Sequence, residues 1–321
     1  MLPLVRQTLI VLVGVAWVCW STGCSVLTQR QVDAVKEFSK ATENYGQLPG
    51  DVIRGYRDMV FMRQALQVGV AEDSETAKES LDAAVIQRDE VTRFAERGDH
   101  ALRVLDDYSR VLTLLVSDNY TSDLNGAAQS LGGQLDSSIA LYNSKFRSSA
   151  TPLDSIGGIV AAVVRGGGGV WIRHRQGAAL RDAVTRADPV VEEMTQAVEE
   201  IAGHYISSRE GTTDTNKTII GIEREQFRET FGTLVGQAAG RNQTVDLLVT
   251  ERVVTVLDRA THTETLAALA KSSAIKYRAA HKKLVSAVKG DASNLEDVLA
   301  QIKALKGEVD AARKLQRQLE K

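Results

Sequence analysis

Histidine is the side chain best suited to bind a metal or move a proton near neutral pH, and this chain has five of them. No two stand four residues apart with a glutamate between them, as in a zinc protease helix, and no cysteine follows residue 24. The sequence therefore predicts no metal site. The histidines are His100, His174, His204, His262 and His281.

Other catalytic patterns are missing from the sequence. The run RGGGGVW at 165–171 lacks the Lys-Ser/Thr pair that follows a phosphate-binding loop, and no strand is predicted before it. No Gly-x-Ser-x-Gly motif marks a serine hydrolase of that class. The sequence therefore predicts no catalytic residue and no cofactor.

Paired acids occur at 106–107, 192–193 and 199–200. Neighbouring residues on a helix point about 100° apart, so each pair is predicted to lie on a solvated face rather than to share a site. His100 lies one heptad before Asp107 on the same face, where the two could form a proton-transfer pair, but a surface hydrogen bond is predicted. His281, on an apolar stripe, is predicted to be a satisfied core histidine. A ligand-sized polar pocket between helices would make an enzyme worth reconsidering.

The amino terminus has the organisation of an export signal. Arg6 precedes an apolar run from Leu9 to Trp20. Counted from Thr8 this run would rise only about 20 Å as a helix, less than the roughly 30 Å hydrocarbon core of a bilayer. We expect residues 1–23 to be a removable signal peptide.

The residues Ser21, Thr22 and Gly23 before Cys24 resemble the lipobox of bacterial lipoproteins. That pattern usually has Leu where this chain has Ser21. The resemblance implies cleavage before Cys24, diacylglycerol on its sulfur and a further acyl chain, such as palmitate, on its amino group. Two alternatives stay open, namely an ordinary signal peptide in which Cys24 is incidental, and an uncleaved anchor.

Lipidation would consume the only cysteine left in the mature chain and give stable membrane anchoring, because more than one acyl chain would be buried. Ser25, in place of Asp, resembles the pattern that is routed to the outer membrane, facing the periplasm. The formal net charge of −2 argues against nucleic-acid binding. We expect a lipid-anchored protein of the bacterial cell envelope.

The spacing of apolar residues predicts long helices. Three stripes advance in steps of four and three residues, over 77–116, 249–288 and 295–319, and the whole chain has only four prolines. Asp73 or Ser74 should cap the first long helix and Gly290 should end the second. Shorter helices are predicted at 32–45, 49–68, 124–146, 170–207 and 215–239, the fourth kinked or broken at Pro189.

These features predict an all-α fold, an elongated bundle of long, coiled-coil-like antiparallel helices in a single domain from 24 to 321. A Gly-rich apolar hairpin at about 152–177 would interrupt it, because consecutive glycines disfavour a helix. This hairpin is either a packed bend or a tip that contacts a membrane or a partner. The residues proposed for such contact are Ile159, Val160, Val163, Arg165, Gly166, Gly167, Gly168, Gly169, Trp171, Arg173 and Arg175.

The function expected from the sequence is that of a non-enzymatic scaffold or binding protein, anchored to the membrane through Cys24 and docking an envelope protein. A homo-oligomer is possible but not required. The alternative is a membrane-active protein that inserts the 156–172 hairpin into a bilayer. A short apolar segment within a bundle of long helices resembles, in architecture only, the pore-forming toxins of the cytolysin A type.

Overall fold

The computed structural model describes residues 27–43, 45, 48–71, 73–117, 122–147, 150–158, 169–207, 218–290 and 295–319. The ordered elements in these ranges are all helices, so the predicted all-α fold is confirmed. The helices are α2 (Gln29–Thr42), α3 (Leu48–Val70), α4 (Ser74–Leu115), α5 (Ser122–Phe146), α7 (Gly169–Ile206), α8 (Ile219–Gly240), α9 (Leu247–Val288) and α10 (Leu295–Leu319).

Polar side chains mark where several helices begin, because the first backbone N–H groups of a helix lack partners within it. Asp73, one of the two predicted caps, accepts a hydrogen bond from the Thr76 amide at 2.8 Å. Thr28 forms a capping box with Gln31 at the start of α2. Gly290, with a φ of 119°, follows the end of α9 as predicted.

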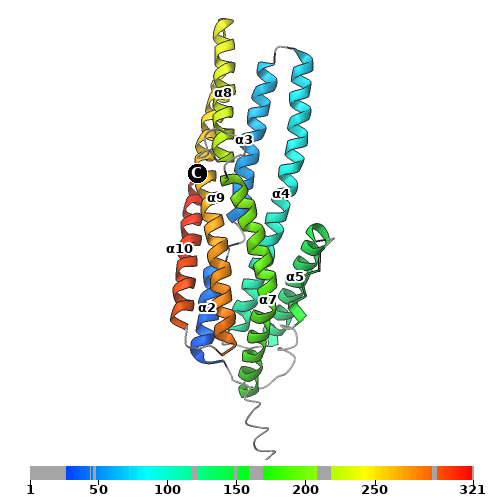
Figure 1. The fold of residues 1–321 in the computed structure, drawn as a ribbon, viewed down its shortest axis with the longest axis vertical. Coiled ribbons are helices and arrows are strands. Elements are labelled where there is room, and N and C mark those ends of the chain that lie inside the picture. The colour runs from blue at the N-terminus through cyan, green and yellow to red at the C-terminus, as the bar shows by residue number, and fades with distance from the viewer. Residues whose placement is uncertain are drawn as a thin grey trace, which may run out of the picture.

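The helices form an elongated bundle in which α9 is central (Figure 1). It packs against α7, α10, α3, α8 and α2. The α3–α4 turn and the top of α8 lie at one end, and the starts of α2 and α7 lie near the opposite end (Figure 1). We call these the distal end and the proximal end, and α5 lies beside α4 nearer the proximal end.

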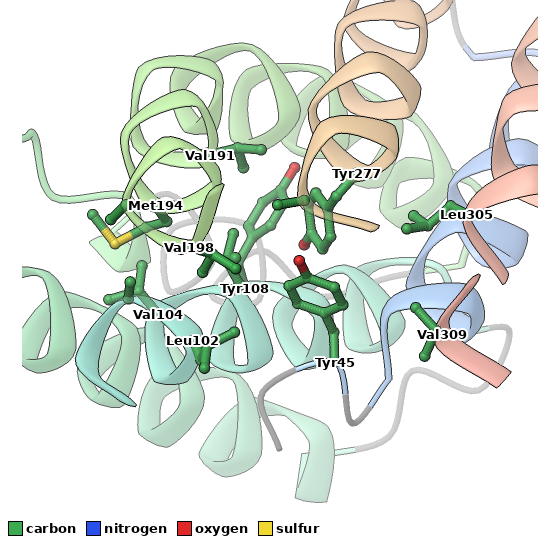
Figure 2. Close-up of a cluster of buried hydrophobic side chains, with 14 of the residues drawn as sticks. Tyr45, Leu102, Val104, Tyr108, Val191, Met194, Val198, Tyr277, Leu305 and Val309 are labelled. Atoms are coloured by element: carbon green, nitrogen blue, oxygen red, sulfur yellow. The ribbon is translucent and has the colours of Figure 1, made fainter. Parts of the chain in front are cut away.

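The core is one cluster of buried side chains concentrated in the proximal half. Figure 2 shows tyrosines 45, 108 and 277 converging at its centre, bordered by aliphatic side chains of α4, α7 and α10. Tyr45, Tyr108 and Tyr277 are each at most 1% exposed. These large rings fill the space where several long helices meet. Smaller side chains on the apolar stripes could not fill it.

The predicted apolar stripes differ in how far they are buried. Along α9 the stripe from Val253 to Val288 is almost wholly buried, and so is the α10 stripe from Val298 to Ala312. In the distal half of α4, however, Leu81 is 53% exposed, because α4 there packs chiefly against α3. Heptad spacing showed which side of α4 is apolar but not how many neighbours would cover it.

Pro189 lies inside α7, which continues from Gly169 to Ile206 without a break. A break there, one of the two predicted outcomes, is therefore wrong. Proline removes one backbone donor from a helix, but the helix can continue where tertiary packing holds it. Both Val190 and Val191, directly after the proline, are 1% exposed in the core.

Candidate functional site

Most of the residues singled out from the sequence lie outside the described residues. These are Cys24 and 159–168, which include Ile159, Val160, Val163, Arg165 and three of the four glycines. Gly169, Trp171, Arg173 and Arg175 fall in the first two turns of α7. The segments that flank them are described.

The first described residue packs against α7 at the proximal end. Leu27 is 7% exposed, and a methyl group added at Gly177 would meet its backbone nitrogen at 3.3 Å. The helix α7 extends from Gly177 back to Gly169, about 12 Å further along its axis. The residue three positions after Cys24 and the segment just after the four glycines thus lie at the same end of the molecule.

Two side chains hold the carboxyl end of α9 at this proximal end. Gln31 of α2 donates from Nε2 to the Ala287 carbonyl at 2.5 Å, and Arg181 of α7 donates from Nε to the Val288 carbonyl at 2.9 Å. The last carbonyls of a helix have no partner within it, so these bonds satisfy them. They also join α2, α7 and α9 into one proximal unit.

The segment that leads into the Gly-rich stretch is fastened to α5. Asn143 exchanges two hydrogen bonds with the Leu153 backbone, at 2.9 and 3.0 Å. Asp136 accepts hydrogen bonds from the amides of Ile156 and Gly157, at 2.8 and 2.6 Å. Ile156 is fully buried. This first residue of the predicted apolar hairpin is thus packed in the bundle, as the packed-bend interpretation expected.

Polar groups cross the core as a chain of three side chains from three helices. The Tyr108 hydroxyl of α4 lies 2.9 Å from His281 Nε2 of α9, and His281 Nδ1 lies 3.2 Å from Asp188 Oδ1 of α7. The His281 side chain is fully buried, and that of Asp188 is 39% exposed. The prediction that His281 is a satisfied core histidine is confirmed.

The protonation state of this chain follows from its burial. Burial lowers the pKa of His281, and the hydrogen bond that its ring donates to Asp188 only partly opposes this. The His281 hydrogen bond lowers the pKa of Asp188. A neutral ring with its proton on Nδ1 fits both contacts, because Nδ1–H donates to the carboxylate and Nε2 accepts from the Tyr108 hydroxyl.

A second set of polar side chains lies beside the Tyr108–His281–Asp188 chain. Ser109 Oγ donates to Thr42 Oγ1 at 2.7 Å and lies 3.3 Å from the Tyr277 hydroxyl. The Phe38 ring stacks edge-on against Tyr277, with centroids 5.2 Å apart. Burial raises the pKa of Tyr277 and of Tyr45. These two hydroxyls are therefore neutral, and the contacts of Ser109 with Thr42 and Tyr277 join α2, α4 and α9.

The sequence reasoning missed both partners of His281. Tyr108 stands one residue before Ser109, which lies on the predicted stripe, so heptad spacing did not select it. Asp188 was given no role. The predicted surface contact of His100 is instead with Lys145, at 3.4 Å. Within the described ranges, no group of three metal-binding side chains comes together.

Comparison of this chain with protein-family models, with curated proteins and with solved structures gives no match. Among the helices described, none combines the length and the apolar character that crossing a bilayer requires.

Proposed function

We propose that this chain is a lipid-anchored helical scaffold of the bacterial cell envelope, attached to the membrane through Cys24 and non-enzymatic. The observation that carries the proposal is the position of Leu27. A lipid on Cys24 would be held within about 11 Å of Leu27 by the covalent chain, and Leu27 is packed at the proximal end rather than along the side of the bundle.

The length of the bundle sets how far the proposed anchor would lie from the distal end. The Ser109–Thr42 hydrogen bond links α4 to α2. From that bond α4 runs about 50 Å to its distal start, and α2 runs about 20 Å to its proximal start. The two directions are opposite (Figure 1). An anchor at Leu27 would therefore hold the α3–α4 turn roughly 70 Å away from it, which suits a protein that presents a docking surface away from the membrane.

Metabolic labelling with an alkyne-tagged palmitate in a bacterial host tests the anchor. The wild-type chain and Cys19→Ala should both carry the label, whereas Cys24→Ala should lose it. Cys19→Ala is the matched control because Cys19 is the only other thiol in the chain. Label retained in Cys24→Ala, or a mature chain that begins at another residue, would overturn the proposal.

The proposed outer-membrane address depends on Ser25. Ser25→Asp should move the protein to the inner membrane in an enteric host, as measured by separating the two membranes on a sucrose gradient. Ser25→Thr is the control and should stay in the outer membrane. Equal distribution of wild type and Ser25→Asp would reject the sorting role of this residue.

We further propose an envelope protein as the docked partner. Crosslinking in the native envelope, followed by identification of the captured protein, addresses this. A captured protein whose deletion changes the diffusion of the lipoprotein would support docking. Free diffusion of the lipoprotein with no captured partner would count against it.

A second candidate function is membrane insertion by the Gly-rich hairpin. It is supported by one observation, that a methyl group added at Gly177 would meet Leu27. The second arm of the proposed hairpin would then lie at the proposed membrane end. Val160→Asp or Trp171→Asp should then abolish liposome leakage while helix content stays unchanged. Loss of fold in these variants would instead mean that the segment is a packed bend.

A further inference from the structure

A polar cleft of about 530 Å³ lies between α4 and α5. Its lining includes Arg103 and Asp107 from α4 and Ser130, Gln134, Ser137 and Ser138 from α5. In Figure 1, α5 stands beside the lower part of α4. The serines and Gly133 on this side of α5 leave space that larger side chains would fill.

Asp107 is the side chain that makes this cleft unusual. It was predicted to lie on a solvated face, which is wrong, since it is only 6% exposed. Ser138 Oγ donates to its Oδ2 at 2.7 Å. Within the described part of the chain, Oδ1 has no hydrogen bond and the carboxyl has no ion pair. Burial raises the pKa of Asp107, an effect that the Ser138 hydrogen bond opposes only in part.

Arg103 lies one helical turn before Asp107, a spacing at which opposite charges often pair. Yet no ion pair joins them, and Arg103 makes none with any other described residue. The next arginine, Arg110, forms its ion pair with Asp106, at 2.8 Å. The charges of Arg110 and Arg103 therefore act on Asp107 without an ion pair and only partly offset the rise in its pKa that burial causes. The cleft therefore presents a desolvated carboxyl at its floor and an exposed guanidinium at its rim.

We propose that this cleft binds a small zwitterion of the amino-acid class. The ligand's ammonium group donates to Asp107 Oδ1, and its carboxylate accepts from the Arg103 guanidinium. Ser130, Ser137 and Gln134 supply further hydrogen bonds around it. A buried carboxyl without a cation is unfavourable, so a bound ammonium group would relieve that cost.

The charge arrangement favours a zwitterion over simpler ions. A cation alone would pair with Asp107 but leave Arg103 without a contact, and an anion alone would bring a negative charge toward Asp107. The inference uses only residues of α4 and α5, so it does not depend on the lipid anchor. Binding, with no covalent step, is all that it requires.

The test uses the full chain in detergent, with L-alanine as the probe and putrescine and acetate as single-charge comparisons. Calorimetry should detect saturable binding of L-alanine at millimolar concentration. Asp107→Asn and Arg103→Gln should each weaken it by about tenfold or more, since each removes a charged hydrogen bond. Asp182→Asn, which changes an exposed carboxylate of α7 outside the cleft, should leave binding unchanged.

Two readouts separate binding from loss of fold. Circular dichroism should be the same for all three variants, and NMR should show that L-alanine lowers the pKa of Asp107 in the wild-type chain. No saturable binding of L-alanine, equal binding of putrescine or acetate, or equal affinity in Asp107→Asn would each overturn the proposal.

Discussion

The Tyr108 hydroxyl and His281 Nε2 lie 2.9 Å apart at the centre of the bundle, where α4 and α9 pack on opposite sides of the core. The ring's other nitrogen contacts Asp188 of α7, so one imidazole joins three helices. Nothing in the spacing of any one helix requires this bond. It forms because each of the two buried polar groups needs the other.

Removing the Tyr108 hydroxyl should be costly. Tyr108→Phe leaves His281 Nε2 buried without a donor, and we expect the free energy of unfolding to fall by about 2 kcal/mol. Urea denaturation measures it. In a His281→Leu background the same change should cost at least about 1 kcal/mol less, because the acceptor is already gone. Equal losses in both backgrounds would show that the two groups are not coupled.

Burial of His281 should make stability fall in mild acid. The folded-state pKa of His281 is lowered, so below about pH 6.5 the unfolded chain takes up the proton first. Stability should therefore fall as pH drops, by up to about 1.4 kcal/mol per pH unit, until the folded state also protonates. Asp188, whose pKa is also lowered, adds its own loss below about pH 4.

Urea midpoints at pH 8, 6 and 5 measure this dependence. His100 also has a lowered pKa and acts in the same direction, so His100→Gln is the comparison variant. His281→Leu should flatten the profile more than His100→Gln does. If the urea midpoint of His281→Leu changes with pH as steeply as that of the wild type, another group causes the pH dependence of stability.

The contact between α5 and the 150–158 segment should depend on two glycines. A methyl group at Gly157 would collide with the Gly132 carbonyl oxygen, whereas one at Gly158 meets nothing within 4 Å. Gly157→Ala should cost about 1 to 3 kcal/mol by overpacking and should expose the segment to limited proteolysis. Gly158→Ala is the control, and matching cleavage rates in the two variants would contradict the prediction.

The ion pair between Arg63 of α3 and Glu223 of α8 should stabilise the distal half. Their side chains are only 11% and 8% exposed, so Arg63→Met would leave a carboxylate without its cation. We expect a loss of about 3 kcal/mol in thermal or urea unfolding. Arg63→Met combined with Glu223→Met should be less damaging than Arg63→Met alone.

The exposed pair Arg186–Asp182 is the matched control for that experiment. Its side chains are 58% and 44% exposed, and Asp182→Asn should cost less than about 1 kcal/mol. A comparable loss from both pairs would show that burial does not set their contribution.

Much of the fold could be predicted from the sequence, because helix formation depends on short-range spacing and on caps. Asp73, Gly290 and the stripe along α9 were all predicted correctly. The stripe along α4 was predicted with equal regularity, yet Leu81 is half exposed. Burial depends on how many helices surround a face, and this is a property of the packed molecule.

The same distinction applies to the sites. By its residues alone the sequence determined the helices, the charge balance, the missing catalytic motifs and the small residues before Cys24. Only the tertiary structure decided that Asp188 and Tyr108 meet His281, that Asp107 is buried in a cleft, and that Leu27 lies against Gly177. These pairs are separated by tens to hundreds of residues or belong to different helices, and periodicity within one helix carries no information about which helix lies opposite.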